Sequence, residues 1–249
     1  MRSSGGRWWK GGGRLTALLL LQASTTLQAG TAPPDGPPLD SIEQRVLPCA
    51  ACHGAEGRAT NDGYYPRIAG KPAGYLYNQL LNFRDGRRVY AQMSYMTQRQ
   101  DQAYLREMAE HFAGLTLPYP APKPATADAA ALQRGATLAT TGDAAAQLPS
   151  CQACHGERLT GVAPQVPGLL GLPYDYLVAQ IGAWRTGNRH AQEPDCMAEI
   201  ARRLKPEDIA AVAAWLAAQP LPADTHPATA FPQKPPMDCG VVEAAGAAR

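Results

Sequence analysis

The sequence predicts an all-α fold made of two tandem halves that are related by internal duplication. Three observations support this fold class. A Cys-x-x-Cys-His motif occurs at 49–53 and again at 151–155. A helical pattern follows each motif, and its second copy lies 101 residues after the first. Each half closes on a further helical pattern, with the copies 104 residues apart, so the order of elements is repeated.

The apolar spacing places these helices. Middle-helix positions 0, +4 and +7 are Leu76, Leu80 and Phe83, repeated as Leu177, Ile181 and Trp184. Closing-helix positions 0, +3 and +7 are Leu105, Met108 and Phe112, repeated as Ile209, Val212 and Leu216. Both spacings put the apolar side chains on one helix face. A fuller opening helix is expected in the second half near 129–138, with Gly135 small enough for a second helix to cross closely, whereas the first half has only a few residues for one.

Composition divides the chain into segments. The expected segments are a signal peptide at 1–29, a Pro-rich leader at 30–40, the first half at 41–117, a Pro-rich linker at 118–127, the second half at 128–219, and a Pro- and Ala-rich tail at 220–249. Proline makes the linker semi-rigid, and the tail lacks apolar periodicity, so we expect it to be poorly ordered.

Each motif has the spacing of a covalent c-type haem site. Cys49 and Cys52, like Cys151 and Cys154, can bond both haem vinyl groups, while His53 or His155 binds the iron from one side. A thioredoxin-like Cys pair would not need the histidine. It would also lie in an alternating strand–helix pattern, which this chain lacks. A zinc ribbon needs its Cys pairs about 15–20 residues apart, and these are 102 apart. The sequence therefore predicts two covalently bound haem c groups.

The first 29 residues have the three parts of an export signal. Four basic residues precede an apolar stretch at 15–21, and Leu27-Gln28-Ala29 resembles a cleavage site. A retained anchor is the alternative, but the apolar part is short and no run reaches the ~20 apolar residues of a membrane span. We expect cleavage and a periplasmic protein with no membrane span in its mature chain.

Removal of this segment changes the formal net charge from +2 to −2. A mildly acidic chain is a poor match for nucleic acid or an anionic membrane surface.

The repeat also indicates the second iron ligand in each half. Met197 lies 12 residues before Ile209, and Met93 lies 12 before Leu105, whereas Met96 lies only 9 before it. Met93 and Met197 are therefore the expected distal ligands, although an isolated methionine is more often core filler. A thioether opposite histidine raises the reduction potential and closes the position where a small substrate would bind.

Together the two motifs, the loops headed by Pro66 and Pro167, the segments 83–88 and 184–189 and the two methionines resemble the dihaem cytochrome c4 family over about 40–219. The resemblance implies two class I cytochrome c domains facing each other across a pseudo-twofold axis. It also implies periplasmic electron transfer from a membrane bc-type complex, or from a dehydrogenase, to a terminal oxidase.

The same resemblance makes the Pro66 and Pro167 carbonyls candidate acceptors for the histidine ring protons. It makes Arg88 and Arg189 candidates for pairing with haem propionates or the opposite domain, and solvated surface arginines are the alternative.

Cys196, which adjoins Met197, has three interpretations. It is a thiolate ligand of the second haem, as in thiosulfate dehydrogenases that resemble this family, or a disulfide partner of Cys239, or a free thiol. An oxidising compartment favours the disulfide. The functions that remain open are an electron carrier, a dihaem oxidoreductase such as thiosulfate dehydrogenase, and the cytochrome subunit of a larger dehydrogenase.

Overall fold

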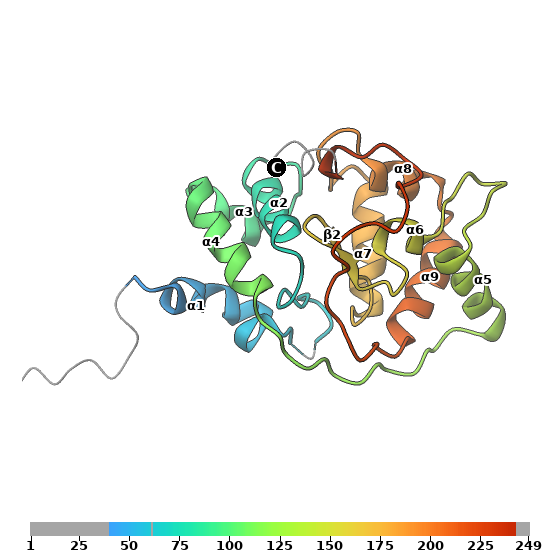
Figure 1. Ribbon diagram of the computed structural model, residues 1–249, viewed down its shortest axis with the longest axis horizontal. Helices are drawn as coiled ribbons and strands as arrows, with labels where there is room; N and C mark the ends of the chain where they lie inside the picture. The colour runs from blue at the N-terminus through green and yellow to red at the C-terminus, as the bar shows by residue number, and fades with distance from the viewer. Residues whose placement is uncertain (1–39, 61, 243–249) are drawn as a thin grey trace, which may run out of the picture. The chain divides into compact units, whose positions relative to one another are not determined.

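The computed structural model describes residues 40–60 and 62–242, and helices dominate this part of the chain (Figure 1). The predicted signal peptide and most of the predicted leader lie outside the described residues. The first half contains α1 (Ile42–His53), the 3₁₀ helix η1 (Ala55–Gly57), α2 (Ala73–Arg84), α3 (Ala91–Thr97) and α4 (Gln102–Ala113). The second contains α5 (Ala129–Thr140), α6 (Cys151–His155), β1 (Gly161–Val162), β2 (Val166–Pro167), α7 (Tyr174–Arg185), α8 (Cys196–Arg203) and α9 (Pro206–Ala218).

The all-α prediction is confirmed, with one short addition. Strands β1 and β2 form an antiparallel ribbon in which Val162 pairs with Val166, in the loop that follows the second motif. None of the helices in the described part of the chain combines the length and hydropathy needed to span a bilayer.

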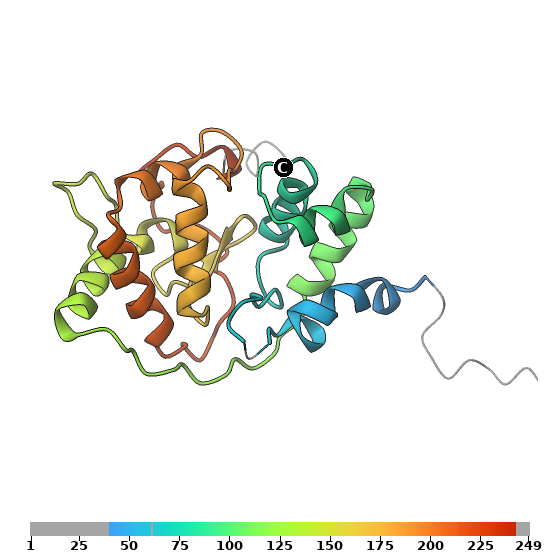
Figure 2. The same cartoon turned by 180° about the vertical axis from the view of Figure 1, so that it is seen from behind.

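Helix α1 begins at Ile42, so only a few of its residues precede Cys49, as expected. The Gln44 amide in the first turn donates to the Ser41 hydroxyl at 3.4 Å, and the helix then continues through both cysteines of the motif. A side-chain acceptor at this position supplies the hydrogen bond that the helix cannot make for itself. Val46 is buried in one cluster with Met108 and Phe112 of α4. Figure 2 shows α1 and α4 from behind.

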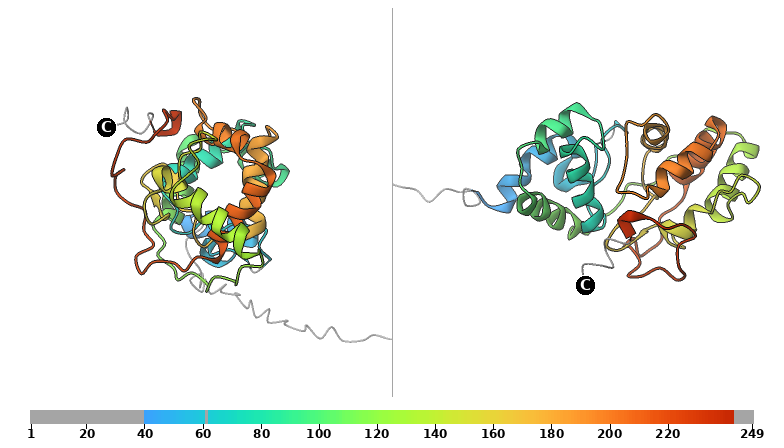
Figure 3. Two further views of the ribbon diagram at one scale, coloured as in Figure 1. Left: turned by 90° about the vertical axis from the view of Figure 1, so that its right-hand side faces the viewer. Right: turned by 90° about the horizontal axis from the view of Figure 1, so that it is seen from above.

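The opening and closing helices of the second half cross closely. A Cβ placed on Gly135 of α5 would lie 2.2 Å from the Ala211 carbonyl oxygen of α9, so only glycine fits. Arg134 joins the same two helices, since its Nε donates to the Asp208 carboxylate at 2.7 Å. Figure 3 shows α5 and α9 lying against each other in both additional views.

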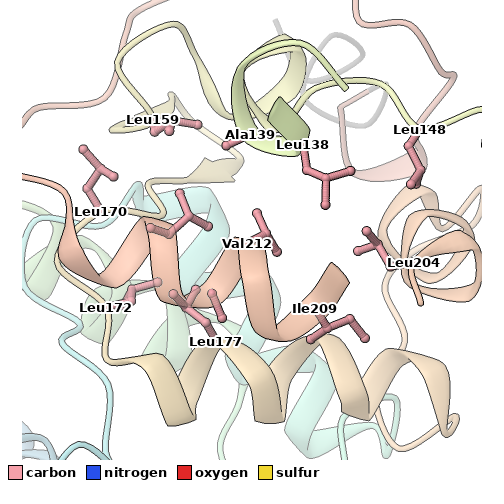
Figure 4. Close-up of a cluster of buried hydrophobic side chains, with 12 residues drawn as sticks. Leu138, Ala139, Leu148, Leu159, Leu170, Leu172, Leu177, Leu204, Ile209 and Val212 are labelled. Carbon is pink, nitrogen blue, oxygen red and sulfur yellow. The ribbon is translucent and has the colours of Figure 1, made fainter. Parts of the chain in front are cut away.

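The predicted closing-helix positions are buried in both halves, whereas Leu80, Ile181 and Trp184 of the middle helices are partly buried. Leu105, Met108 and Phe112 of α4 are buried, as are Ile209 and Leu216 of α9. In Figure 4 apolar side chains from α5, α7, α9 and the loops meet in the second half. Burial of such side chains contributes ~1.5–3 kcal/mol each to folding, before conformational entropy is subtracted.

The described part of the tail differs from the poorly ordered segment we expected. The Ala228 amide donates to the Gly161 carbonyl oxygen at 2.9 Å, and the Ala163 amide donates back to Ala228 at 2.8 Å. A disulfide joins Cys196 to Cys239. The tail thus forms a single bridge to β1 at Ala228, and backbone contacts of this kind leave no apolar periodicity in the sequence.

Candidate functional site: two haem-binding motifs

The two Cys-x-x-Cys-His motifs occupy the same structural position in their halves. The first ends α1 and the second forms α6, and a glycine follows each histidine with a left-handed φ, 76° at Gly54 and 83° at Gly156. A Cβ on Gly54 would lie 2.4 Å from the Ala59 carbonyl oxygen. The chain can therefore turn sharply under each histidine only because glycine tolerates this conformation.

Both histidines are fixed through one ring nitrogen. The Nδ1 atom of His53 lies 2.9 Å from the Pro66 carbonyl oxygen, and that of His155 lies 2.8 Å from the Pro167 carbonyl oxygen. A carbonyl can only accept, so Nδ1 carries the proton and Nε2 keeps its lone pair for a metal. These are the contacts that the family resemblance implied.

Burial keeps both rings neutral. It is the main cause of the lowered pKa of His53 and of His155, ahead of the opposing effect of the proline carbonyls. A nearby cation lowers each pKa further: Arg88 acts on His53, and Lys71 acts on His155. A neutral imidazole is the form that binds iron.

The cysteines of both motifs are half-buried thiols in this structure. Burial raises the pKa of Cys151 to about 12 and also raises the pKa of Cys49. In the described residues no three His, Cys, Asp or Glu side chains converge on a point that could hold a metal ion. The donor sets therefore do not match a zinc site and fit thioether attachment of a haem with a single histidine ligand.

The structure supports the alignment of the two methionine segments. Arg84, at the end of α2, donates to the Gln100 carbonyl oxygen, and Arg185, at the end of α7, donates to the Leu204 carbonyl oxygen. Gln100 and Leu204 are 104 residues apart, the same offset that relates Met93 to Met197.

Met93 is half-buried in α3 and Met197 is half-buried in α8, whereas Met96 is 40% exposed. The hydroxyl of buried Thr97 donates to the Met93 carbonyl oxygen at 2.9 Å and so fixes this turn of α3. The positions of both methionines are therefore compatible with a role as distal ligands.

The two predicted arginines meet at a contact between the halves. Arg88 and Arg189 pair as an antiparallel bridge: the Val89 amide donates to Asn188 at 2.8 Å, and the His190 amide donates to Arg87 at 2.6 Å. Both guanidinium groups are buried, so the solvated-surface alternative does not hold.

Two glutamine and tyrosine pairs that the sequence analysis missed complete this contact. Arg88 donates to Gln79, Gln180 and the Tyr176 hydroxyl, and Arg189 donates to Gln180, Gln79 and the Tyr75 hydroxyl. These partners recur at an offset of 101, so aligning the two halves could have found them.

Unpaired polar groups near the motifs test whether a haem fits. Trp184, the first residue of the segment 184–189, has a buried Nε1 with no hydrogen-bond partner. No carboxylate in the described residues forms an ion pair with Arg88 or Arg189. A buried donor without an acceptor costs ~1–3 kcal/mol, and an anionic haem propionate could accept from the Trp184 indole. Arg88 and Arg189 already donate to neutral glutamine and tyrosine side chains, and a propionate would give them the negative charge that these partners do not supply.

Comparisons with known proteins agree with this arrangement. The cytochrome c family model matches residues 132–219. A thiosulfate dehydrogenase electron acceptor of Thiomonas intermedia is 40% identical over 173 residues, which is 70% of this chain and 79% of that protein. A cytochrome c4 of Thiocapsa roseopersicina is 31% identical over 173 residues, covering 68% of this chain and 85% of the relative.

Two solved structures are also similar. Cytochrome c4 of Acidithiobacillus ferrooxidans superimposes with a TM-score of 0.58 at 27% identity, covering 70% of this chain and 99% of that one. A thiosulfate dehydrogenase of Marichromatium purpuratum superimposes with a TM-score of 0.62 at 37% identity. The match covers 70% of this chain and 36% of the Marichromatium chain, so it spans about a third of that chain's length.

Proposed function

Since this chain belongs to the dihaem cytochrome c4 family and binds two covalent haem c groups as an electron-transfer protein, we propose that it accepts electrons in the periplasm from a dehydrogenase that oxidises thiosulfate. When bound, each haem supplies a one-electron couple at its iron. The membrane bc-type complex remains the alternative electron donor, and a terminal oxidase is the proposed acceptor.

Each half contributes an equivalent set of residues. Cys49, Cys52, Cys151 and Cys154 hold the haems, His53 and His155 bind iron on one side, and Met93 and Met197 bind it on the other. Pro66 and Pro167 orient the histidines, and Arg88 and Arg189 lie at the contact between the halves. With a histidine and a methionine on each iron, neither haem would keep an open position for a substrate, which would suit transfer of electrons rather than chemistry on sulfur.

The duplicated His–Pro contact carries the carrier assignment, because both rings are held in the same neutral tautomer with Nε2 available. The disulfide supports the same assignment. Cys196 Sγ is bonded to Cys239, and a sulfur in that bond is not a thiolate ligand. The choice of donor rests on the 40% identity to an electron acceptor of thiosulfate dehydrogenase.

The periplasmic location rests on the signal-like segment at 1–29 and on the chemistry of haem attachment. The exported protein should begin near Gly30 and carry two haems. N-terminal sequencing and a pyridine haemochrome count of material from the periplasmic fraction test both points.

A stopped-flow experiment tests the proposed donor. The oxidised dihaem protein is mixed with thiosulfate, with and without a catalytic amount of a thiosulfate dehydrogenase, and haem reduction is followed by absorbance. We expect reduction to be fast only when the dehydrogenase is present. Failure to accept these electrons would contradict the proposed donor. Turnover of thiosulfate by the protein alone, lost in Cys196→Ala, would show that it is itself the enzyme.

A further inference from the structure

Lys71 is a buried cation that crosses from one half of the protein to the other. Its ammonium group donates to the Gly168 carbonyl oxygen of the second half at 3.1 Å, and the residue is only 5% exposed. Thr160 and Gly168 of the second half line the small space around it, together with Gly70 and Tyr119.

This charge has no acidic partner among the residues that the structure describes, where no ion pair involves Lys71. Its neighbour Arg67 is also a buried cation, and it donates to the Leu117 and Pro118 carbonyl oxygens. Burial, with the charge of Arg67 adding to it, lowers the pKa of Lys71 to about 8. The ammonium form still predominates at neutral pH, at a cost in desolvation that a surface lysine would not have.

The internal repeat shows that packing does not require lysine here. Lys71 corresponds to Leu172 at the offset of 101, and each precedes the proline that begins a middle helix. Leu172 is part of the apolar core of its own half. The first half therefore places a charge where its duplicate has an apolar side chain.

The ammonium lies beside the structure that holds the proximal histidine of the second haem. His155 donates to the Pro167 carbonyl oxygen, and Lys71 donates to the carbonyl oxygen of the next residue, Gly168. Lys71 is buried, so its charge is poorly screened by water at this point. A fixed cation beside the support of the histidine that would bind iron favours loss of one positive charge at that metal.

We propose that Lys71 raises the reduction potential of the second haem. It does so as a fixed positive charge of the first half, held beside the Pro167–Gly168 segment that orients His155. This inference rests on the proposed role of His155 as iron ligand. The second haem then holds an electron more tightly when the halves are in contact than when they are apart. By reciprocity, its reduction strengthens the contact between the halves.

The effect is specific to one haem. The cation that acts on His53 is Arg88, a residue of its own half that also takes part in the symmetric contact. Lys71 has no charged counterpart, so its removal should change one centre much more than the other. Two unit charges less than about 10 Å apart in a protein interior change an equilibrium on the order of tenfold.

The test measures both midpoint potentials of the dihaem protein by spectroelectrochemical titration at pH 7. Met197→His, which should lower only the second potential, identifies the wave of the second haem. In Lys71→Met we expect the equilibrium constant for reduction of that haem to fall roughly tenfold, with the first haem changed much less. Lys71→Arg keeps the charge, so its equilibrium constant for reduction of the second haem should lie within about twofold of the wild-type value.

Lys123→Met is the matched control, because it removes one lysine charge from an exposed position in the linker. It should leave both potentials unchanged. Equal second-haem potentials in the wild type, Lys71→Met and Lys123→Met would overturn the inference, provided each protein carries two haems and keeps its methionine–iron absorption. Equal shifts of both haems in Lys71→Met would also overturn it. A wild-type protein without two haems or without methionine ligation would instead remove the proposed function, and this inference with it.

Discussion

At the scale of the residue, one backbone carbonyl decides which nitrogen of each histidine is available. Pro66 and Pro167 accept from the Nδ1 atoms of His53 and His155, so the tautomer is set before any metal binds. For the proposed second ligand, only the register of the repeat distinguishes Met93 from its apolar neighbour Met96. Substitution at single residues tests that distinction directly.

Met93→His should leave both haems attached and lower the potential of the first haem. A nitrogen ligand favours the ferric state more than a thioether does, and axial ligands span a range of roughly 0.8 V. The weak long-wavelength absorption of methionine–iron coordination should fall by half. Met96→His, on the exposed side of the same helix, is the control and should change neither value. A lower potential and a weaker methionine absorption in Met96→His, with no change in Met93→His, would identify Met96 as the ligand.

Lys71 should make stability depend on pH in an alkaline window. Its pKa is about 8 in the folded protein and 10.5 ordinarily, so the unfolded chain binds more protons between these values. Stability of the wild type relative to Lys71→Met should therefore rise from pH 8 to pH 10.5, by about 3 kcal/mol at most. Arg67, His155 and Tyr119 lie around Lys71. Their titrations contribute to both proteins and cancel in the difference between the wild type and Lys71→Met. Urea unfolding at several pH values measures the difference, and a pH-independent difference would contradict it.

At the scale of the element, most helices were predictable because their apolar period survives in both copies. The closing helices α4 and α9 bury the predicted side chains. The Cys196–Cys239 attachment of the tail was predictable from its cysteines. The β1–β2 ribbon and the hydrogen bonds of Ala228 were not, because backbone groups make them and leave no side-chain pattern. At the site, spacing alone indicated the cysteines and histidines. Lys71 was missed because a lysine in a sequence reads as solvated.

The crossing of α5 and α9 gives a matched pair of glycine substitutions. Gly135→Ala should destabilise the protein by about 1–3 kcal/mol, because the new Cβ would overlap the Ala211 carbonyl oxygen. Gly182→Ala, in the interior of α7, meets nothing within 4 Å and should stabilise the helix by about 0.5–1 kcal/mol. Urea denaturation of the two variants checks the opposite signs. Equal effects would show that the helices do not cross at Gly135.

At the scale of the whole molecule, covalent and polar links attach the tail and linker to the halves. The Cys196–Cys239 bond joins residues separated by 43 positions and fixes the tail beside α8. Arg67 binds the linker through the Leu117 and Pro118 carbonyl oxygens, and its guanidinium lies 3.9 Å from the Tyr119 ring centroid. The disulfide and Arg67 therefore tie the described tail and the first residues of the linker to the two halves.

Removal of the disulfide should lower stability without changing the electron-transfer properties. Closing a loop of this length is worth about 4 kcal/mol on a chain-entropy estimate. Cys196→Ala/Cys239→Ala should therefore unfold at lower urea concentration, while the second haem keeps its potential and its methionine absorption. A non-reducing mass measurement of the wild type should show two hydrogens fewer than the dithiol. Quantitative alkylation of both cysteines without reductant would rule out the bond.

The bridge between Arg88 and Arg189 is self-complementary, because each half contributes the equivalent donors and acceptors to it. Every group needed for the contact is thus present in a single copy of the repeat. An ancestral protein of half this length, with one haem, could have formed the same seam as a symmetric pair of identical chains. Fusion of the two genes would then have made the association permanent and freed each copy to diverge, as the exchange of leucine for lysine at one position illustrates.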